Sequence, residues 1–363
     1  MDLTLYKLQP PPGGGFHFGQ QGLELEESRV VFPSDSLFAA MVATIAEQEG
    51  SSAVDTFVQP FRQGQPPFCL TSVFPIAGSL PLLPLPHLPI HTQAKDERQR
   101  EALLPRKFNK KVRFVSPLIC QKLCAAAEMD TYLTAENGRF LQNGAIWLTA
   151  AEQTLLPDAW HSFEPEALNQ QAVWQQGSVP RVTIDRLHNS SNIYLMGRVT
   201  FNQACGLWVG VQYEDTALIE RTESLLHHLG DRGIGGERSN GYGAFEPVKL
   251  AYQWPSWTEG NGYHLLLSRY LPTQAEVRPA LQDGDKTLIA YRLVTVGGWL
   301  ATPYQPHLRR KQISMLAEGS IVGDNVRGYM ADVQPKWQDF PHPVWRNGFA
   351  LTLPAKALEP EAV

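Results

Sequence analysis

The residues most suited to chemistry in this 363-residue chain lie in Gly230–Gly243, which holds six glycines in fourteen positions. Glycine has no Cβ, so successive backbone N–H groups can converge on an anion and the main chain can approach a phosphate closely. Arg232 and Arg238 add positive charge, and Ser239 and Asn240 add neutral hydrogen-bonding groups. The segment therefore predicts a loop that grips phosphates and reads little base sequence.

Two familiar nucleotide-binding loops do not fit this segment. No GK[ST] ending follows the glycines, which excludes a Walker A loop. The dinucleotide fingerprint needs a strand before its glycines and a helix after them, whereas here a helical pattern precedes and the extended Tyr242–Phe245 follows. A tight helix-to-strand connection without any ligand is the alternative that composition leaves open.

The charge of the chain limits how it can bind an anion. A formal net charge of −5 argues against a protein that coats nucleic acid indiscriminately, so anion binding has to be local. One basic patch, Pro105–Arg113, contains no acid. We predict contacts to an anion from three of its residues, Lys110, Lys111 and Arg113, although a solvated positive face is the plainer interpretation of such a run.

Candidate metal and nucleophile residues are few. Asp35 and Asp185 each lack a second carboxylate at a short helical spacing, so we predict no metal-dependent nuclease. Asp35 is expected to act at a helix N-terminus. The four cysteines form no CxxC pair and have no zinc-site spacing. We therefore expect no catalytic residue, no metal and no cofactor.

The chain shows no feature of a secreted or membrane protein. The N-terminus lacks a charged start followed by an apolar core, and prolines interrupt the apolar stretch Leu80–Ile90. We expect a protein of the reducing cytoplasm, without contact to a membrane.

The elements that position these residues follow from hydrophobic periodicity. We predict helices over Leu37–Ile45, Ser116–Glu128, Asp215–His228, which Gly230 should end, and Gln274–Leu281. Extended segments are predicted at Leu3–Leu8, Leu23–Phe32, Asn143–Thr149, Pro180–Phe201 (a β-hairpin), Gly206–Tyr213, His264–Tyr270, Thr287–Val296, Gln312–Gly319 and Phe349–Leu353.

These elements predict an α+β protein made of two units, 1–252 and 253–363, each a small sheet with helices on one face. The boundary is placed near the Trp254-Pro255-Ser256-Trp257 turn. Residues of about 60–105 are proline-rich and weakly patterned, so we expect an insertion or irregular excursion there.

The pattern GxGGxRSxGYGxF after a helix, at Gly233–Phe245, resembles the glycine-rich signature of the RAMP superfamily, the RRM-like RNA-binding subunits of CRISPR systems. Within it, the chain resembles the family of fourth subunits of the Csm complex, the type III-A interference machine. Four further stretches carry the resemblance: Phe16–Gly19 (FHFG), Phe32–Ala40 (FPSDSLFAA), Lys110–Ser116 (KKVRFVS) and Arg181–Arg186 (RVTIDR).

The resemblance implies two ferredoxin-like (RRM-like) domains and a non-catalytic role. Such a subunit holds the repeat-derived 5′ tag of the crRNA and joins the large palm-domain subunit to the backbone subunits, meeting target RNA only indirectly. Carried over, the residues that would line the tag are Gly233, Gly235, Gly236, Arg238, Ser239, Asn240, Gly241 and Tyr242.

The hairpin 181–201 would act as a thumb-like element near the junction of tag and spacer. Its tip can wedge between unstacked bases. A local Asp–Arg pair in the RVTIDR stretch is expected to steady its base. The predicted RNA-contacting residues of the hairpin are Arg181, Asp185, Arg186, His188, Asn189 and Asn192.

Three alternatives remain at this point. The chain could be the equivalent subunit of a type III-B (Cmr) complex. It could be a RAMP endoribonuclease that processes crRNA with His17 as the general base, although we expect His17 to touch RNA or to pack beside Phe16 and Phe18. It could also be a protein scaffold without RNA contact, which would suit its acidic charge but leave the glycine-rich loop without a role.

Overall fold

The computed structural model of the chain describes residues 3–19, 27–94, 108–184, 191–257, 259–282, 289–300, 308–335 and 342–356. Its fold is a mixed α+β fold, as the hydrophobic patterns predict. The main sheet is antiparallel, with the strand order β12-β1-β11-β3-β4 and β2 also paired with β11. Its strands are β1 (Thr4–Gln9), β2 (Phe68–Leu70), β3 (Phe74–Ala77), β4 (Leu80–Pro81), β11 (Cys205–Tyr213) and β12 (Glu246–Leu250).

Strands β1 and β11 lie inside the molecule because both faces of the sheet are covered. Tyr6 and Leu8 of β1 belong to one buried cluster, whereas Leu5 belongs to another on the opposite face. The first cluster includes residues of the helices at 34–49, 51–62 and 219–232. The second includes residues of the sheet formed by 83–84, 114–115, 138–141 and 146–149 and of the helix at 117–124. This two-sided burial follows the period-2 alternation of side chains along a strand.

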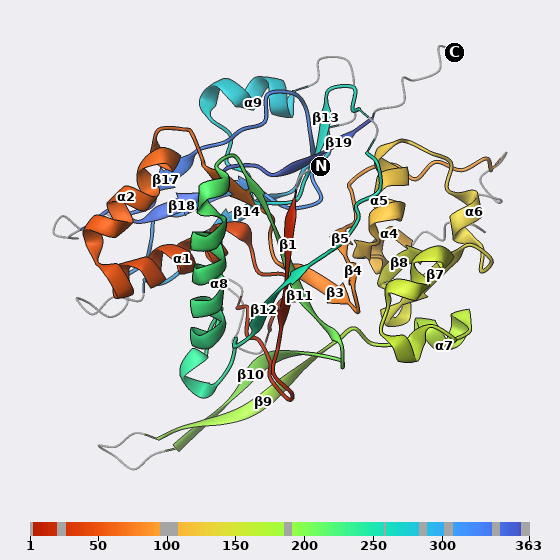
Figure 1. The fold of residues 1–363 in the computed structure, drawn as a ribbon, viewed down its shortest axis with the longest axis horizontal. Helices are drawn as coiled ribbons and strands as arrows, with labels where there is room; N and C mark the ends of the chain where they lie inside the picture. The colour runs from red at the N-terminus through yellow and green to blue at the C-terminus, as the bar shows by residue number, and fades with distance from the viewer. Residues whose placement is uncertain are drawn as a thin grey trace.

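Three helices cover one face of the main sheet, on the same side of β1 in Figure 1. They are α1 (Ser34–Glu49), α2 (Ser51–Arg62) and α8 (Ile219–Arg232), which follows the 3₁₀ turn Thr216–Leu218. The predicted apolar faces of α1 and α8 are confirmed, since Leu37, Met41 and Leu226 are fully buried. Helix α2 was not predicted, because Pro60 lies within it and only Val58 and Phe61 are buried.

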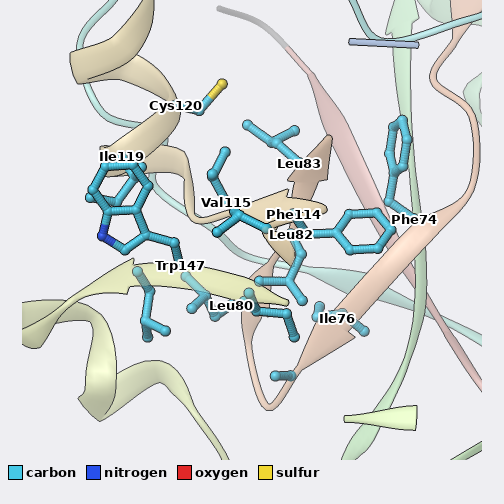
Figure 2. Packing of buried hydrophobic residues seen from close by; sticks show 14 of the residues in the cluster. Phe74, Ile76, Leu80, Leu82, Leu83, Phe114, Val115, Ile119, Cys120 and Trp147 are labelled. Atoms are coloured by element: carbon cyan, nitrogen blue, oxygen red, sulfur yellow. The ribbon is translucent and has the colours of Figure 1, made fainter. Parts of the chain in front are cut away.

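A second sheet, in the order β5-β6-β8-β7, packs on the other face. Figure 2 shows its core, where Phe114 of β6 lies toward Phe74 and Ile76 of the main sheet, and Trp147 of β8 lies on the far side, beside Ile119. The elements of this unit are β5 (Leu83–Pro84), α4 (Phe108–Lys111), β6 (Phe114–Val115), α5 (Pro117–Cys124), α6 (Asp130–Leu133), β7 (Gly138–Leu141), β8 (Ile146–Thr149), α7 (Pro165–Asn169) and the 3₁₀ turns Gln142–Gly144, Ala150–Leu155 and Asp158–Trp160.

The expectation of an insertion or irregular excursion over about 60–105 is wrong for the part of that segment up to residue 84. Strands β2 and β3 pair with β11, and β4 and β5 follow directly. All four residues of β3 are buried, so the alternation that normally identifies a strand is absent. Residues 95–107 of this segment lie outside the described residues.

The predicted hairpin is confirmed and is longer than expected. Strands β9 (Trp174–Ile184) and β10 (Ser191–Phe201) pair antiparallel over eleven residues each. The ribbon extends away from the body of the molecule in Figure 1. Val182, Ile193 and Leu195 are exposed apolar residues of this ribbon.

The C-terminal part contains small antiparallel sheets and one helix. Their strand orders are β16-β13-β19, β14-β15 and β17-β18. The helix α9 (Gln274–Leu281) is confirmed at its predicted bounds. The strands are β13 (Tyr263–Leu266), β14 (Leu293–Val296), β15 (Ile313–Leu316), β16 (Ile321–Val322), β17 (Met330–Asp332), β18 (Trp345–Asn347) and β19 (Thr352–Ala355).

The prediction that Gly230 ends its helix is wrong. Helix α8 continues through Gly230 to Arg232, and a Cβ on Gly230 would lie 2.2 Å from the Phe245 carbonyl oxygen, which favours glycine there. Asp35 lies in the first turn of α1, as predicted, but its side chain makes no capping hydrogen bond. It is buried in an ion pair with Arg346 of β18, with 2.8 Å between Oδ2 and Nη1.

Candidate nucleic-acid interface

The glycine-rich loop begins where α8 ends, at Gly233, whose N–H still donates to the Leu229 carbonyl (2.8 Å). The loop then folds onto the segment that follows β1. Gly236 N–H donates to the His17 carbonyl, and Gly243 N–H donates to the Gly15 carbonyl, both at 2.9 Å. In Figure 1 this end of α8 lies beside the start of the hairpin β9–β10.

Two loop glycines are required by close approach as well as by backbone conformation. Gly235 has a φ of +88°, and a Cβ there would lie 2.5 Å from the His17 carbonyl oxygen. Gly243 has a φ of +86°, and its Cβ would lie 2.1 Å from the Ile234 carbonyl oxygen. An L side chain is strained at such φ values, so both positions favour glycine for the chain's own packing.

The outer side of the loop forms an open pocket of about 530 Å³, lined by Arg232, Gly235, Gly236, Glu237, Arg238 and Ser239. We call it the loop pocket. The backbone amides of Gly235, Glu237, Arg238 and Ser239 donate no hydrogen bond to another described residue. Arg238 and Ser239 are exposed. Backbone N–H groups that donate no hydrogen bond, together with an exposed guanidinium, form a concave site suited to a phosphate.

Acidic groups moderate this charge. Arg232 pairs with Glu47 of α1. Glu237, which sequence reasoning did not single out, lines the loop pocket with a left-handed backbone, and its carboxylate accepts a hydrogen bond from the Asn240 amide at 2.5 Å. The charge available to a ligand is therefore carried chiefly by Arg238.

His17 connects the loop to the hairpin. The side chain is 5% exposed, and its Nδ1–H donates to the Gly197 carbonyl of β10 at 2.7 Å. Its own carbonyl accepts from Gly236. His17 is therefore buried between loop and hairpin, and the rings of its neighbours Phe16 and Phe18 lie 5.2 Å apart in one buried cluster.

Tyr242 lies beneath two arginines of the hairpin. Its side chain is buried, and the guanidinium carbons of Arg181 and Arg198 are 5.5 and 5.6 Å from its ring centroid. The Nε atoms of both arginines are buried without a hydrogen-bond partner among the described residues. Sequence reasoning named Arg181 and Tyr242 as contacts but did not foresee that they meet, or that Arg198 joins them.

Other predicted contacts lie elsewhere. Asp185, Arg186, His188 and Asn189 are outside the described residues, as is the side chain of Asn192, whose backbone pairs with Thr183.

The basic patch is separated from the loop. Lys110 and Lys111 are exposed on α4, which is distant from α8 in Figure 1, and Arg113 precedes β6 in the same unit. Partial burial, and to a lesser degree Arg292, lower the pKa of Arg113. The structure therefore does not bring these three residues to the loop pocket.

The described residues contain no group of three His, Cys, Asp or Glu side chains placed to hold a metal ion. Within the same residues, no helix is long and apolar enough to cross a membrane. The cysteines at 120 and 124 are buried in the core, as their spacing on a helix predicts.

Known proteins of the same length resemble the chain throughout. The Csm4 protein of Streptococcus thermophilus is 26% identical over 349 residues, covering 93% of this chain and 95% of the relative. That of Thermococcus onnurineus is 26% identical over 295 residues, with coverages of 81% and 83%. A model of the CRISPR Csm4 C-terminal domain matches residues 259–355. The chain is thus similar to Csm4 proteins over most of its length.

Solved Csm4 structures have the same fold. The Csm4 chain of a Csm3–Csm4 subcomplex of the type III-A CRISPR–Cas interference complex superimposes with a TM-score of 0.68 at 18% identity, covering 98% of this chain and all of that one. A Csm1–Csm4 cassette in complex with pppApA gives a TM-score of 0.56 at 19% identity, with coverages of 99% and 100%. The Csm4 C-terminal model begins after β12, so the loop pocket belongs to the part of the chain that precedes it.

Proposed function

We propose that this chain is a non-catalytic crRNA-binding subunit of a type III-A effector complex, which holds the 5′ tag of the guide RNA. The observation that carries the proposal is the loop pocket of about 530 Å³. Its wall includes exposed Arg238 and four backbone N–H groups that donate no hydrogen bond to another described residue. Such a site recognises phosphates of an RNA backbone rather than base edges. The similarity to Csm4 proteins favours type III-A over the type III-B alternative.

The proposed partners are the large palm-domain subunit and the backbone subunit of the complex. The solved relatives that support this are in complex with Csm1 in one case and with Csm3 in the other. We propose that this chain joins the same two kinds of subunit.

We also infer that the first unit, 1–252, is a ferredoxin-like domain. Its order in sequence is β1, α1, β2 and β3, β11, α8 and β12, and its antiparallel strand order is β12-β1-β11-β3. This is the β-α-β-β-α-β arrangement. We propose 253–363 as a second RRM-like domain, and the match of the C-terminal family model over 259–355 supports that boundary.

The geometry of His17 supports a positioning role rather than catalysis. A general base must reach the proton that it removes, directly or through a water. His17 is 5% exposed and its Nδ1–H is engaged by Gly197, so the ring is held between loop and hairpin. Cleavage of repeat RNA by the purified chain, abolished in His17→Ala, would establish the endoribonuclease alternative instead.

The proposed function is tested by the salt dependence of RNA binding. The purified chain is titrated against a single-stranded tag RNA at several salt concentrations, and we expect a clearly negative slope of log affinity against log salt. A slope near zero, together with assembly of the complex from RNA-free subunits, would support a protein scaffold instead. The combined variant Arg238→Ala and Gly236→Asp should lower the crRNA content of the purified complex.

The proposed thumb role of the hairpin has its own test. Replacing residues 189–192 with glycine and serine should change nuclease protection of the nucleotides at the junction of tag and spacer while overall affinity is retained. Unchanged protection would show that the hairpin is no thumb.

A further inference from the structure

A second pocket of about 380 Å³ lies at the N-terminal end of α1. Its wall combines Arg29, Asp35, Ser36 and Arg269 with the strand β14 of the C-terminal part. We call it the junction pocket, because residues from both ends of the chain form it. No role has been assigned to it so far, although it contains part of the FPSDSLFAA stretch.

Positive charge is in excess around the junction pocket. Two arginines, Arg29 and Arg269, line it, three more interact with these or with Asp35, and three acids offset the positive charge in part. Arg269 pairs with Glu318 at 3.0 Å, and Arg346 pairs with Asp35. Burial and the nearby Arg346 lower the pKa of Arg310 to about 10, with Asp35 acting in the opposite sense. The five are Arg29, Arg269, Arg292, Arg310 and Arg346, and the acids are Glu27, Asp35 and Glu318.

Arg29 is also close to other positive charges. Burial is the main cause that lowers the pKa of Arg29, and the neighbouring Arg269 and Arg292 lower it further. Cations that are brought together in this way favour an anion, because a phosphate relieves their mutual repulsion.

The opposite wall of the junction pocket is apolar and accessible. Leu293, at the start of β14, is 57% exposed, and Val294 and Val296 continue this wall. Among the described residues β14 pairs with β15 alone, so its other edge is available on this side. An exposed leucine beside crowded arginines suits a ligand that has both a charged group and a flat apolar face, as a nucleotide has.

The junction pocket adjoins the loop pocket through the ring of His17. A Cβ on Gly236 of the loop pocket would lie 2.9 Å from His17 Cδ2, and a Cβ on Gly19 of the junction pocket would lie 3.3 Å from His17 Nε2. His17 and Gly19 are two residues apart, which spans at most about 7 Å. Two stacked nucleotides, at roughly 3.4 Å each, cover that distance.

We propose that the junction pocket holds one nucleotide of the RNA strand whose phosphates the loop pocket grips, with the phosphate toward Arg29 and Ser36 and the base against Leu293. This inference rests on the proposed function, since it extends the path of the same RNA. In this proposal, the RNA-binding surface includes the pocket formed by residues 19–36 together with Arg269 and residues 293–297.

The test uses the full chain and single-stranded oligouridylates of about 4 to 12 nucleotides, with affinity measured by fluorescence anisotropy. For the unaltered chain we expect the affinity to rise when the RNA becomes long enough to reach from the loop pocket to the junction pocket. Leu293→Asp and Arg29→Gln should each remove about tenfold of that gain without changing the affinity for the shortest RNA that binds. Arg238→Ala should weaken binding at every length.

The control is Val277→Asp, an exposed apolar residue on α9, which should leave the whole length series unchanged. Full retention of the gain in both Leu293→Asp and Arg29→Gln overturns the inference. A chain that binds short RNA but gains nothing from longer RNA also overturns it, while the role of the loop pocket stands. Absence of binding at all lengths overturns both this inference and the proposed function. The melting temperature of each variant, which should match that of the unaltered chain, shows that the fold is retained.

Discussion

At the C-terminal end of α8, Arg238 is exposed beside amides without a partner, whereas near the N-terminal end of α1, Arg269 and Arg346 are only 5% and 4% exposed and are paired with acids. The same residue type therefore serves two purposes. An exposed guanidinium beside unused donors can meet a ligand. A guanidinium that is buried against a carboxylate instead fixes how parts of the chain pack together.

The buried pairs tie the C-terminal strands to the main sheet. The Ser34 hydroxyl accepts from Arg269 N–H at 2.9 Å, and the Ser72 hydroxyl donates to Glu318 at 2.5 Å. Together with the pair of Asp35 and Arg346, these bonds join α1 and the residue before Val73 to segments at least 235 residues further along the chain. The stretch at Pro33–Ser36 is thus a structural junction as well as a wall of the junction pocket.

The largest effect on stability is expected from removing the buried ion pair between Asp35 and Arg346. Asp35→Ala leaves the Arg346 guanidinium buried without its partner, so the free energy of unfolding should fall by about 3–5 kcal/mol. The unfolding midpoint in urea measures this loss. The double variant Asp35→Leu and Arg346→Met should recover part of the stability, and a double variant that is no more stable than Asp35→Ala would contradict the charge argument.

A matched pair of glycine variants tests the loop itself. Gly235→Ala should cost roughly 2–4 kcal/mol, because it combines a strained φ with a Cβ placed 2.5 Å from the His17 carbonyl oxygen. Gly241→Ala, at a φ of +81° with nothing within 4 Å of its Cβ, should cost about 1 kcal/mol. Thermal unfolding compares the two, and equal losses would show that the close approach to His17 is unimportant.

The variant Arg238→Ala tests whether the exposed guanidinium of Arg238 contacts RNA. RNA affinity should fall about tenfold and the salt slope should decrease by about one, because one phosphate contact is lost. The urea midpoint should not change, in contrast to Asp35→Ala. A stability loss as large as that of Asp35→Ala would show that Arg238 is structural.

The smallest effect is expected at the contact between hairpin and loop. Arg198→Gln removes one of the two guanidiniums over the Tyr242 ring, which should cost about 0.5–1 kcal/mol of stability. Hydrogen exchange of the β10 amides should become faster near residue 198 and remain unchanged in β1. Uniformly faster exchange would mean that the contact stabilises the whole fold and not the hairpin alone.

Local sequence patterns were sufficient to predict the helices and strands that are buried on one face only. The apolar faces of α1 and α8, the helix α9 and the alternation of β1 were all predicted from spacing. Strand β3 was missed, because it is buried on both faces and contains Pro75. Gly230 was taken as a helix end because its reason for being glycine, the Phe245 carbonyl, lies fifteen residues away.

The composition of the loop predicted an anion-binding turn, but the neighbours of the loop could not be predicted. The contacts of Gly236 with His17 and of Tyr242 with Arg181 join segments that are distant in the sequence. The partner of Asp35, at position 346, is separated from it by most of the chain, so the sequence predicted only a local role at the helix N-terminus and not the ion pair. The junction pocket could not be predicted either, because its lining residues are distant from one another in the sequence.

The pairing of β1 has a consequence for synthesis of the chain. Both of its neighbours in the sheet, β11 and β12, follow it by about 200 residues or more. The backbone groups of β1 therefore stay without sheet partners until β11 has left the ribosome, and the sheet closes only when residue 250 follows. A chain with such distant pairings folds slowly. Since the glycine-rich loop lies between α8 and β12, the loop pocket is completed by the same late step that closes the sheet.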